Sequence, residues 1–168
     1  MRIDEINECD AARFVELLGG IFEHSPWVAE RVLPKRPFTD GTELHHEMVM
    51  EVREASEQQR HDLLCAHPEL AGREAQAGNL TSDSKREQAA AGLNQCSTEE
   101  LARIKQFNQD YYTKFGFPFI IAVSGLDKLQ ILAAMEKRLA NSPQQEFATA
   151  VAEVEKIGRI RLDKLIDE

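Results

Sequence analysis

The chain has 168 residues, of which 42% are hydrophobic and 29% charged, a composition typical of globular proteins that argues against extended disorder. Its length predicts a single domain, 1–168, built around one core. With 29 acidic against 20 basic residues the formal net charge is -9. Because such a chain repels a phosphate backbone, we expect no nucleic-acid partner.

The cysteines and the chain ends indicate a cellular location. Cys9, Cys65 and Cys96 are odd in number and form no Cys-x-x-Cys motif, which predicts buried thiols in a reducing compartment. No apolar signal segment follows Met1, and no run approaches the roughly 18 apolar residues of a membrane span. The last residues do not form a peroxisomal targeting signal. We therefore expect a cytoplasmic protein that does not bind membranes.

The first third of the chain predicts three helices. Residues 10–18 form the first, which two glycines follow. The second, over 25–33, begins with a Ser-Pro pair, in which the serine accepts a backbone N–H and the proline needs none. The third, over 40–55, begins at Asp40 or Thr42.

The middle of the chain predicts a helix on either side of a loop. Residues 57–66 form a helix that ends before Pro68, because proline disfavours the helical conformation of its predecessor. His67 therefore stands at a helix exit. The polar stretch 72–82 is predicted to be a surface loop, and a further helix is expected over 84–93.

The last third contains the one stretch whose apolar residues do not follow helical periodicity. A capping box at 97–100 opens a long helix that Gly116 ends. The apolar run 117–123 fits a short buried strand or an extended connector, and helices follow over 126–139 and 142–166. Since no second strand is available for pairing, we predict an all-α bundle of about seven or eight helices with an extended apolar connector at 117–123.

The last predicted helix carries an arginine on its apolar face. At about 100° per residue, Arg161 lies within roughly 40° of the apolar positions, whereas Arg159 is expected in solvent. A buried guanidinium cannot lose its proton, so it must meet a carboxylate or an anionic ligand. Three explanations for Arg161 remain open: a structural ion pair, a side chain whose charged end extends into water, and an anion-binding site. The apolar face consists of Phe147, Val151, Val154, Gly158 and Leu165.

Two further polar residues are candidates for chemistry. His67 follows an apolar helix end, and an imidazole exchanges protons near cellular pH; a histidine bonded to a carbonyl is the alternative. Glu87 is expected in the first turn of its helix, where the helix dipole favours a carboxylate without any functional role. The N–H groups of that turn also suit a polar ligand. Neither residue identifies a function by itself.

No metal site is predicted. His45 and His46 are adjacent and point to different helix faces, and no two-histidine, one-carboxylate spacing can be drawn through the other histidines. A catalytic cysteine is not predicted either, because Cys65 and Cys96 have no positive neighbour in sequence that would lower the thiol pKa.

Four separated blocks carry a resemblance to a known family. The sequence resembles the decarboxylases of 2-oxo-4-hydroxy-4-carboxy-5-ureidoimidazoline (OHCU) in the order and spacing of these blocks over nearly the whole chain. The blocks are FEHSPW at 22–27, AHPELAG at 66–72, Ser84 with the Glu-Gln pair at 87–88, and FGFPFIIAV at 115–123.

The resemblance implies a dimeric all-α enzyme without metal or organic cofactor that converts OHCU into (S)-allantoin in urate breakdown. It implies that His67 is the catalytic acid or base, that Glu87 contacts the substrate hydroxyl, and that Arg161 binds the anionic or carbonyl edge. The further substrate contacts that it implies are Pro68, the turn of Ser84, Lys85, Arg86 and Gln88, and main-chain groups of Phe119, Ile120, Ile121, Ala122 and Val123.

Two other classes of function compete with this interpretation. A non-catalytic protein that binds a small purine-derived anion would keep Arg161 and the connector but would not need His67 to titrate; a pH profile of turnover separates the two. A scaffold protein would use the face of Tyr111, Tyr112 and Phe115 as an interaction surface.

Overall fold

The computed structural model describes residues 1–167, and at position 73 the backbone only. Over this range it contains ten α-helices, two 3₁₀ helices and no strand, so the all-α prediction is confirmed. The number exceeds the predicted seven or eight because α1 and α6, which have only 6 and 4 residues, were not predicted. The elements are α1 (Ile3–Glu8), α2 (Ala11–Leu18), α3 (Trp27–Val32), η1 (Leu33–Lys35), α4 (Gly41–Glu54), α5 (Glu57–Cys65), α6 (Arg73–Gln76), α7 (Ser82–Ala90), η2 (Leu93–Gln95), α8 (Thr98–Phe115), α9 (Lys128–Leu139) and α10 (Pro143–Leu165).

Several of the described helices begin at a side chain that satisfies an otherwise unpaired backbone donor. Asp10, Asp40, Ser56, Ser97 and Asp127 each accept a hydrogen bond from the backbone N–H three residues further on. Such caps stabilise a helix by about 1 kcal/mol each. They confirm the predicted starts of four helices, and they move the start of α9 two residues beyond the prediction.

The structure contradicts one predicted cap and one predicted helix start. The Ser25 hydroxyl donates to the carbonyl oxygen of Glu23 at 3.1 Å, and Pro26 takes the N-cap of α3 without a side-chain bond. Ser84 lies inside α7, because Thr81 is the cap and its hydroxyl accepts the Ser84 N–H at 3.2 Å. Threonine supplies the same acceptor as serine, so the helix begins at the earlier of two competing hydroxyls.

Two helices escaped prediction. The polar helix α1 buries only Ile6, and α6 lies in the stretch 72–82 that was expected to be a loop. Helices this short show no apolar periodicity and depend on tertiary contacts. Gly19 also ends α2 in the right-handed region, at φ -65°, whereas Gly116 ends α8 in the left-handed region, at φ 80°.

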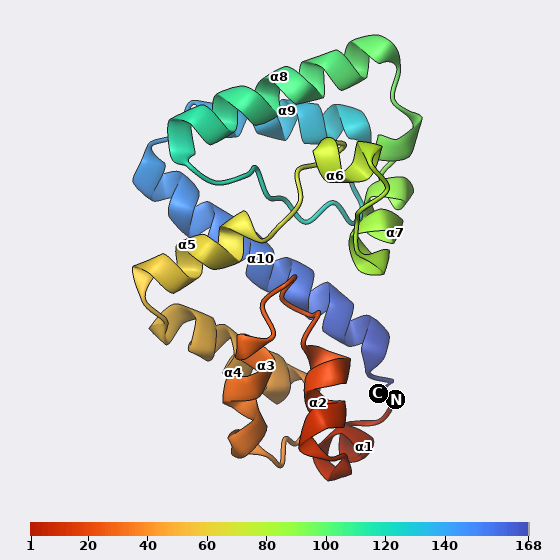
Figure 1. Ribbon diagram of the computed structural model, residues 1–168, viewed down its shortest axis with the longest axis vertical. Coiled ribbons are helices and arrows are strands. Elements are labelled where there is room, and N and C mark those ends of the chain that lie inside the picture. Colours follow the sequence, from red (N-terminus) through yellow and green to blue (C-terminus); the bar gives the residue numbers. More distant parts are fainter. Residues whose placement is uncertain (168) are drawn as a thin grey trace. The chain divides into compact units, whose positions relative to one another are not determined.

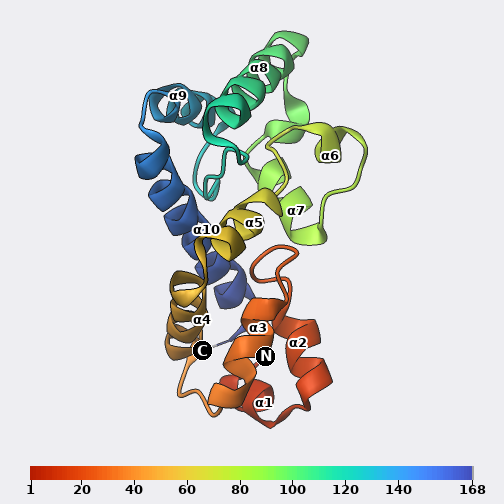
Figure 2. The ribbon, with the colours of Figure 1, turned by 60° about the vertical axis from the view of Figure 1, so that its left-hand side comes forward.

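Contacts divide the chain into two compact units: unit 1 contains residues 1–66 and 154–167, and unit 2 contains residues 67–153. The prediction of one domain stays a prediction. Within unit 1, α3 packs against α2 and α4 (Figures 1 and 2). A Cβ added to Gly158 would lie 3.2 Å from Cζ of Phe22, so glycine permits the close approach of the segment after α2. The unit's fully buried side chains include Phe14, Leu18, Val28, Leu44, Met48 and Leu64.

Aromatic rings form the centre of unit 2, where α8 lies beside α9 (Figure 1). The ring of Tyr111 lies 4.5 Å from that of Phe115 and 5.3 Å from that of Phe119, and Phe117 packs on Phe147 at 6.0 Å. The connector is therefore extended and still part of the core. Tyr111 and Phe115 are 1% and 9% exposed, so of the three residues expected to form a scaffold surface, two lie in the core and Tyr112, at 47%, is exposed.

The structure also bears on the membrane and cysteine predictions. In the part of the chain that the structure describes, no helix combines the length and apolar character needed to cross a bilayer. The prediction of buried thiols was wrong, because Cys65 is exposed, and Cys9 and Cys96 are partly exposed. Cys65 ends α5 on its outer face, which the apolar sequence around it did not indicate.

Candidate functional site

His67 is the first residue after the C-cap of α5, and its side chain is 8% exposed. The segment that follows it contains a backbone conformation that non-glycine residues rarely adopt. Ala71 has φ 47°, and the described chain contains only one other such residue, His24 at φ 52°. Both lie in motif blocks that the sequence singled out. Conformations of this kind cost about 1–3 kcal/mol and concentrate at functional sites.

Two buried amide side chains fasten the backbone after His67. Gln88 of α7 accepts the Ala71 N–H at 2.9 Å and lies 3.5 Å from the carbonyl oxygen of Glu69. Asn108 of α8 donates to the carbonyl oxygen of Leu70 at 3.1 Å. The strained segment is thus held from two helices, and Gln88 reaches it directly.

Sequence reasoning missed Asn108, although a signal was present. This asparagine is 3% exposed and lies in the apolar stripe of α8 with Ile104, Tyr111 and Phe115. A polar residue at a core position of a helix must find a partner. The argument that singled out Arg161 therefore applies to Asn108 as well.

Helix α7 carries Ser84, Glu87 and Gln88, and Gln88 bonds to the segment after His67. Because α7 begins at Ser82, Glu87 lies in its second turn, and the expected position in the first turn was wrong. Local stabilisation by the helix dipole therefore explains Glu87 less well, since that effect falls off after the first turn. Lys85 and Arg86 are exposed, and Arg86 pairs with Asp83 at 2.6 Å.

The connector at 117–123 presents backbone groups. Arg138 holds the carbonyl oxygen of Ile120 at 2.6 Å, and Glu153 accepts the Ala122 N–H at 3.4 Å. Within the described chain, the N–H groups of Ile120, Ile121 and Val123 donate to no protein acceptor. Backbone donors are normally paired, so these three suit a polar ligand.

Arg161 belongs to unit 1, and it is buried as the helical periodicity predicted, at 4% exposure. Its Nη2 lies 3.0 Å from Oε2 of Glu23, which is 1% exposed, and its Nη1 donates to the carbonyl oxygen of Gly20 at 3.2 Å. Arg159 is partly exposed and pairs with Asp163 at 2.9 Å. Of the alternatives for Arg161, an ion pair with a buried acid is present.

The predicted catalytic residues are divided between the two units. His67 and Glu87 both belong to unit 2, where Gln88 connects α7 to the segment after His67. Arg161 lies in the other unit, so its convergence with His67 and Glu87 stays a prediction.

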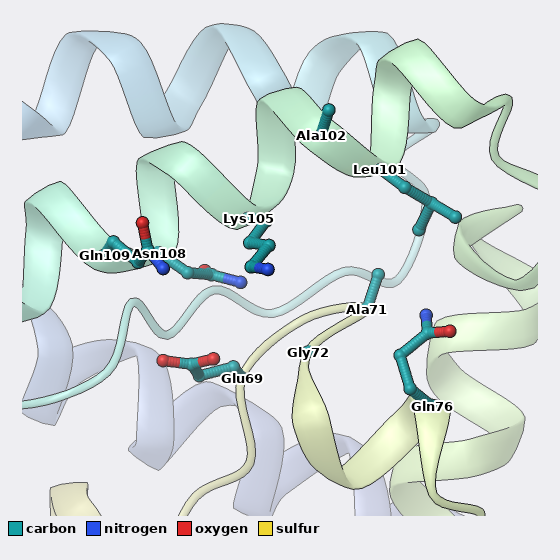
Figure 3. A pocket seen from close by; sticks show the side chains of 9 residues that line it. All are labelled: Glu69, Ala71, Gly72, Gln76, Leu101, Ala102, Lys105, Asn108 and Gln109. Carbon is teal, nitrogen blue, oxygen red and sulfur yellow. The ribbon is translucent and has the colours of Figure 1, made fainter.

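A cavity of about 510 Å³ borders the segment after His67 (Figure 3). Figure 3 shows Lys105 directed from α8 toward the chain at Ala71 and Gly72. The volume falls in the range of small-molecule sites, but none of the predicted site residues lines the cavity, so it is not the predicted substrate pocket. The lining consists of Glu69, Ala71, Gly72, Gln76, Leu101, Ala102, Lys105, Asn108 and Gln109.

No candidate metal centre is found among the residues that the structure describes. In these residues, no group of three or more histidine, cysteine, aspartate or glutamate side chains is placed to hold a metal ion.

Comparison with known proteins defines the class. The sequence model described as OHCU decarboxylase matches residues 7–163. A 2-oxo-4-hydroxy-4-carboxy-5-ureidoimidazoline decarboxylase of Haloferax volcanii is 40% identical over 162 residues, which are 96% of this chain and 94% of that protein. The chain belongs to the OHCU decarboxylase family.

Other relatives are longer than this chain. A uric acid degradation bifunctional protein of Bacillus sp. (strain TB-90) is 40% identical over 168 residues, which are 100% of this chain and 33% of that protein. The crystal structure of an (S)-allantoin synthase matches with a TM-score of 0.81 at 31% identity, over 99% of this chain and 55% of that one. The chain therefore spans between a third and nearly all of the relatives that it matches.

Proposed function

We propose that this protein decarboxylates OHCU to (S)-allantoin in urate breakdown, and that it does so without a metal or organic cofactor. Membership of the OHCU decarboxylase family supports the reaction. The single observation that carries the proposal is the position of His67, which is buried and followed by a strained segment fastened to the helix of Glu87. A protein that only binds an anion would not need this arrangement around a titratable group.

The substrate explains why no cofactor is required. When the bond from the ring carbon to the carboxylate breaks, its electron pair flows into the neighbouring ring C=N bond, which acts as the electron sink. A proton neutralises the ring nitrogen that receives the electron pair, the hydroxyl proton is lost as the ring C=O forms, and a proton is added to the neighbouring carbon on one face of the enol-like intermediate. The protein has only to orient the carboxylate and control these three proton transfers.

Each predicted residue has a role in this scheme. Arg161 binds the anionic or carbonyl edge of the substrate, Glu87 accepts the hydroxyl hydrogen bond, and His67 delivers the proton that fixes the (S) configuration. Pro68 and the turn of Ser84–Gln88 form the wall of the site. The backbone N–H groups of the connector bind the carbonyl oxygens of the ring, consistent with their lack of a protein acceptor in the described chain.

The assembly and location are part of the same proposal. We propose a homodimer in the cytoplasm, with OHCU as its small-molecule partner. The net charge of -9 favours no nucleic acid as a partner. Light scattering during size-exclusion chromatography measures the assembly and would contradict the dimer if the mass corresponded to one chain.

The decisive experiment compares two histidine variants. OHCU decays spontaneously to a racemate, so freshly made OHCU is followed by both absorbance and the circular dichroism of the product. We expect His67→Ala to lower turnover by about a hundredfold or more, because general acid–base groups contribute at least that factor. The remaining product should be racemic. His46→Ala, at an exposed position of α4, should behave as the wild type.

Two results would contradict the proposal. Formation of (S)-allantoin by His67→Ala at the wild-type rate would remove the assigned proton donor. Wild-type protein that neither accelerates OHCU loss nor gives an optically active product would remove the activity altogether, and an anion-binding function would then be the better explanation.

A further inference from the structure

A buried ion pair in unit 2 connects three helices. Arg138 of α9 is 8% exposed and Glu146 of α10 is 0% exposed. The Nη2 and Nε atoms of the arginine lie 2.8 Å and 3.1 Å from Oε2 of the glutamate. Glu146 also accepts hydrogen bonds from Tyr111 of α8 and from Asn141. Four donor atoms therefore surround one carboxylate that water does not reach.

The same guanidinium holds the connector. Nη1 of Arg138 donates to the carbonyl oxygen of Ile120 at 2.6 Å, and its carbon Cζ lies 4.4 Å from the centre of the Phe119 ring. The contact is charge-assisted, which makes it about twice as strong as a neutral hydrogen bond. Glu146 holds the edge of the guanidinium formed by Nε and Nη2, and the remaining nitrogen, Nη1, fixes the peptide between Ile120 and Ile121.

Stability alone does not account for this pair. Transfer of two charges from water into a core is costly, and apolar residues of similar volume stabilise a fold at least as well. The connector has no strand partner that would set its backbone geometry. The ion pair supplies that geometry, because a planar guanidinium held at two edges has one orientation.

We infer that Arg138, oriented by Glu146, is a positioning residue that fixes the Ile120–Ile121 peptide so that the Ile121 N–H binds the substrate. The inference rests on the proposed function. Donation from a cation to the Ile120 carbonyl polarises the peptide and strengthens its N–H as a donor. The Ile121 N–H donates to no acceptor in the described chain, so a ligand can take this hydrogen bond.

Steady-state kinetics with Arg138→Lys test the inference, with the melting temperature and circular dichroism as checks on folding. Lysine keeps the charge but cannot hold the carboxylate and the carbonyl with three nitrogens. We expect KM to rise about tenfold and kcat to change by less than about threefold, because His67 and Glu87 are untouched. Arg53→Lys is the matched control, since Arg53 pairs with Glu155 through two bonds of 2.9 Å on the surface.

A second variant separates positioning from structure. Tyr111→Phe/Arg138→Met/Glu146→Leu replaces the network with apolar groups and should keep or raise the melting temperature. If Arg138 positions the connector, KM rises about tenfold in this stable variant too. KM within twofold of the wild type in folded Arg138→Lys or in the folded triple variant overturns the inference while the proposed function stands. Wild-type protein without activity on OHCU overturns both.

Discussion

Two buried arginine–glutamate pairs, one in each unit, differ in the backbone that the arginine holds. In unit 1, Arg161 contacts Glu23 and the carbonyl oxygen of Gly20, in the segment between α2 and α3. In unit 2, Arg138 contacts Glu146 and the carbonyl oxygen of Ile120, in the connector. Each pair thus fastens an irregular segment to a helix.

The difference teaches that burial of a guanidinium does not by itself identify its function. We propose that Arg161 contacts the substrate, whereas Arg138 acts through the connector. The two assignments predict different responses to the same substitution, because a residue that touches substrate and one that positions a peptide do not lose the same contacts. Substitutions in both pairs therefore test the comparison.

The largest effect is expected when Glu146 alone is removed. Glu146→Leu leaves the Arg138 guanidinium buried without its carboxylate, and breaking a buried pair in this way costs about 3–5 kcal/mol of unfolding free energy. Urea denaturation followed by circular dichroism measures the loss. The triple apolar variant should recover most of it, because no charge remains in the core. A loss below about 1 kcal/mol in Glu146→Leu would show that the pair is hydrated.

Arg161→Lys comes next and acts on activity. A lysine cannot reproduce the two-nitrogen contact with Glu23 and Gly20, and it cannot present a planar fork to an anion. We expect KM for OHCU to rise about tenfold or more, equivalent to about 1.4 kcal/mol of lost binding. Unchanged KM would make Arg161 a structural residue and would leave the comparison with only one functional arginine.

The two arginines also show which features of the site can be predicted from the sequence. The helical periodicity placed Arg161 in an apolar stripe, and the structure agrees. Arg138 follows Ile131 and Met135 at the same kind of spacing, so the same argument would have found it. Its partner could not be predicted, because Glu146 meets Arg138 across the loop between α9 and α10, whose course the sequence pattern does not indicate.

The irregular segments were the least predictable part of the site. The sequence identified the connector as the one non-helical apolar run, but the hydrogen bond to Ile120 comes from a residue 18 positions away. The strain at Ala71 had no signal, because alanine normally disfavours positive φ. It persists because Gln88 and Asn108 hold the backbone on either side. Such contacts depend on tertiary structure, whereas helix caps are local and were mostly predicted.

Acid titration should show a smaller effect of the same network. Burial raises the pKa of Glu146, but hydrogen bonds from Arg138, Tyr111 and Asn141 outweigh burial and hold the pKa below the ordinary 4.5. A carboxyl group with a lowered folded-state pKa contributes stability above its unfolded pKa, and this is lost as pH falls through the folded value. The unfolding free energy should therefore decrease below about pH 4.5, by at most about 1.4 kcal/mol per pH unit from this group.

The control for the acid titration is Glu146→Gln, which cannot ionise. Other carboxyl groups with lowered pKa values, such as Glu43 and Glu100, contribute to the slope in both proteins. The difference between the two slopes therefore reports Glu146 alone. Equal slopes would mean that the folded-state pKa of Glu146 does not lie below its unfolded value, and the network would then not stabilise the ionised carboxyl.

The smallest effect is expected for the substitution Arg159→Lys, two residues before Arg161. Arg159 lies on the same helix, pairs with Asp163 at 2.9 Å and donates to the Thr42 hydroxyl at 3.0 Å, both at exposed positions. Surface contacts of this kind contribute less than about 0.5 kcal/mol each. Arg159→Lys should therefore leave KM and the unfolding free energy at wild-type values. If it raised KM as much as Arg161→Lys does, substrate binding would not depend on the buried contacts of Arg161 in particular, and burial would not distinguish the two arginines.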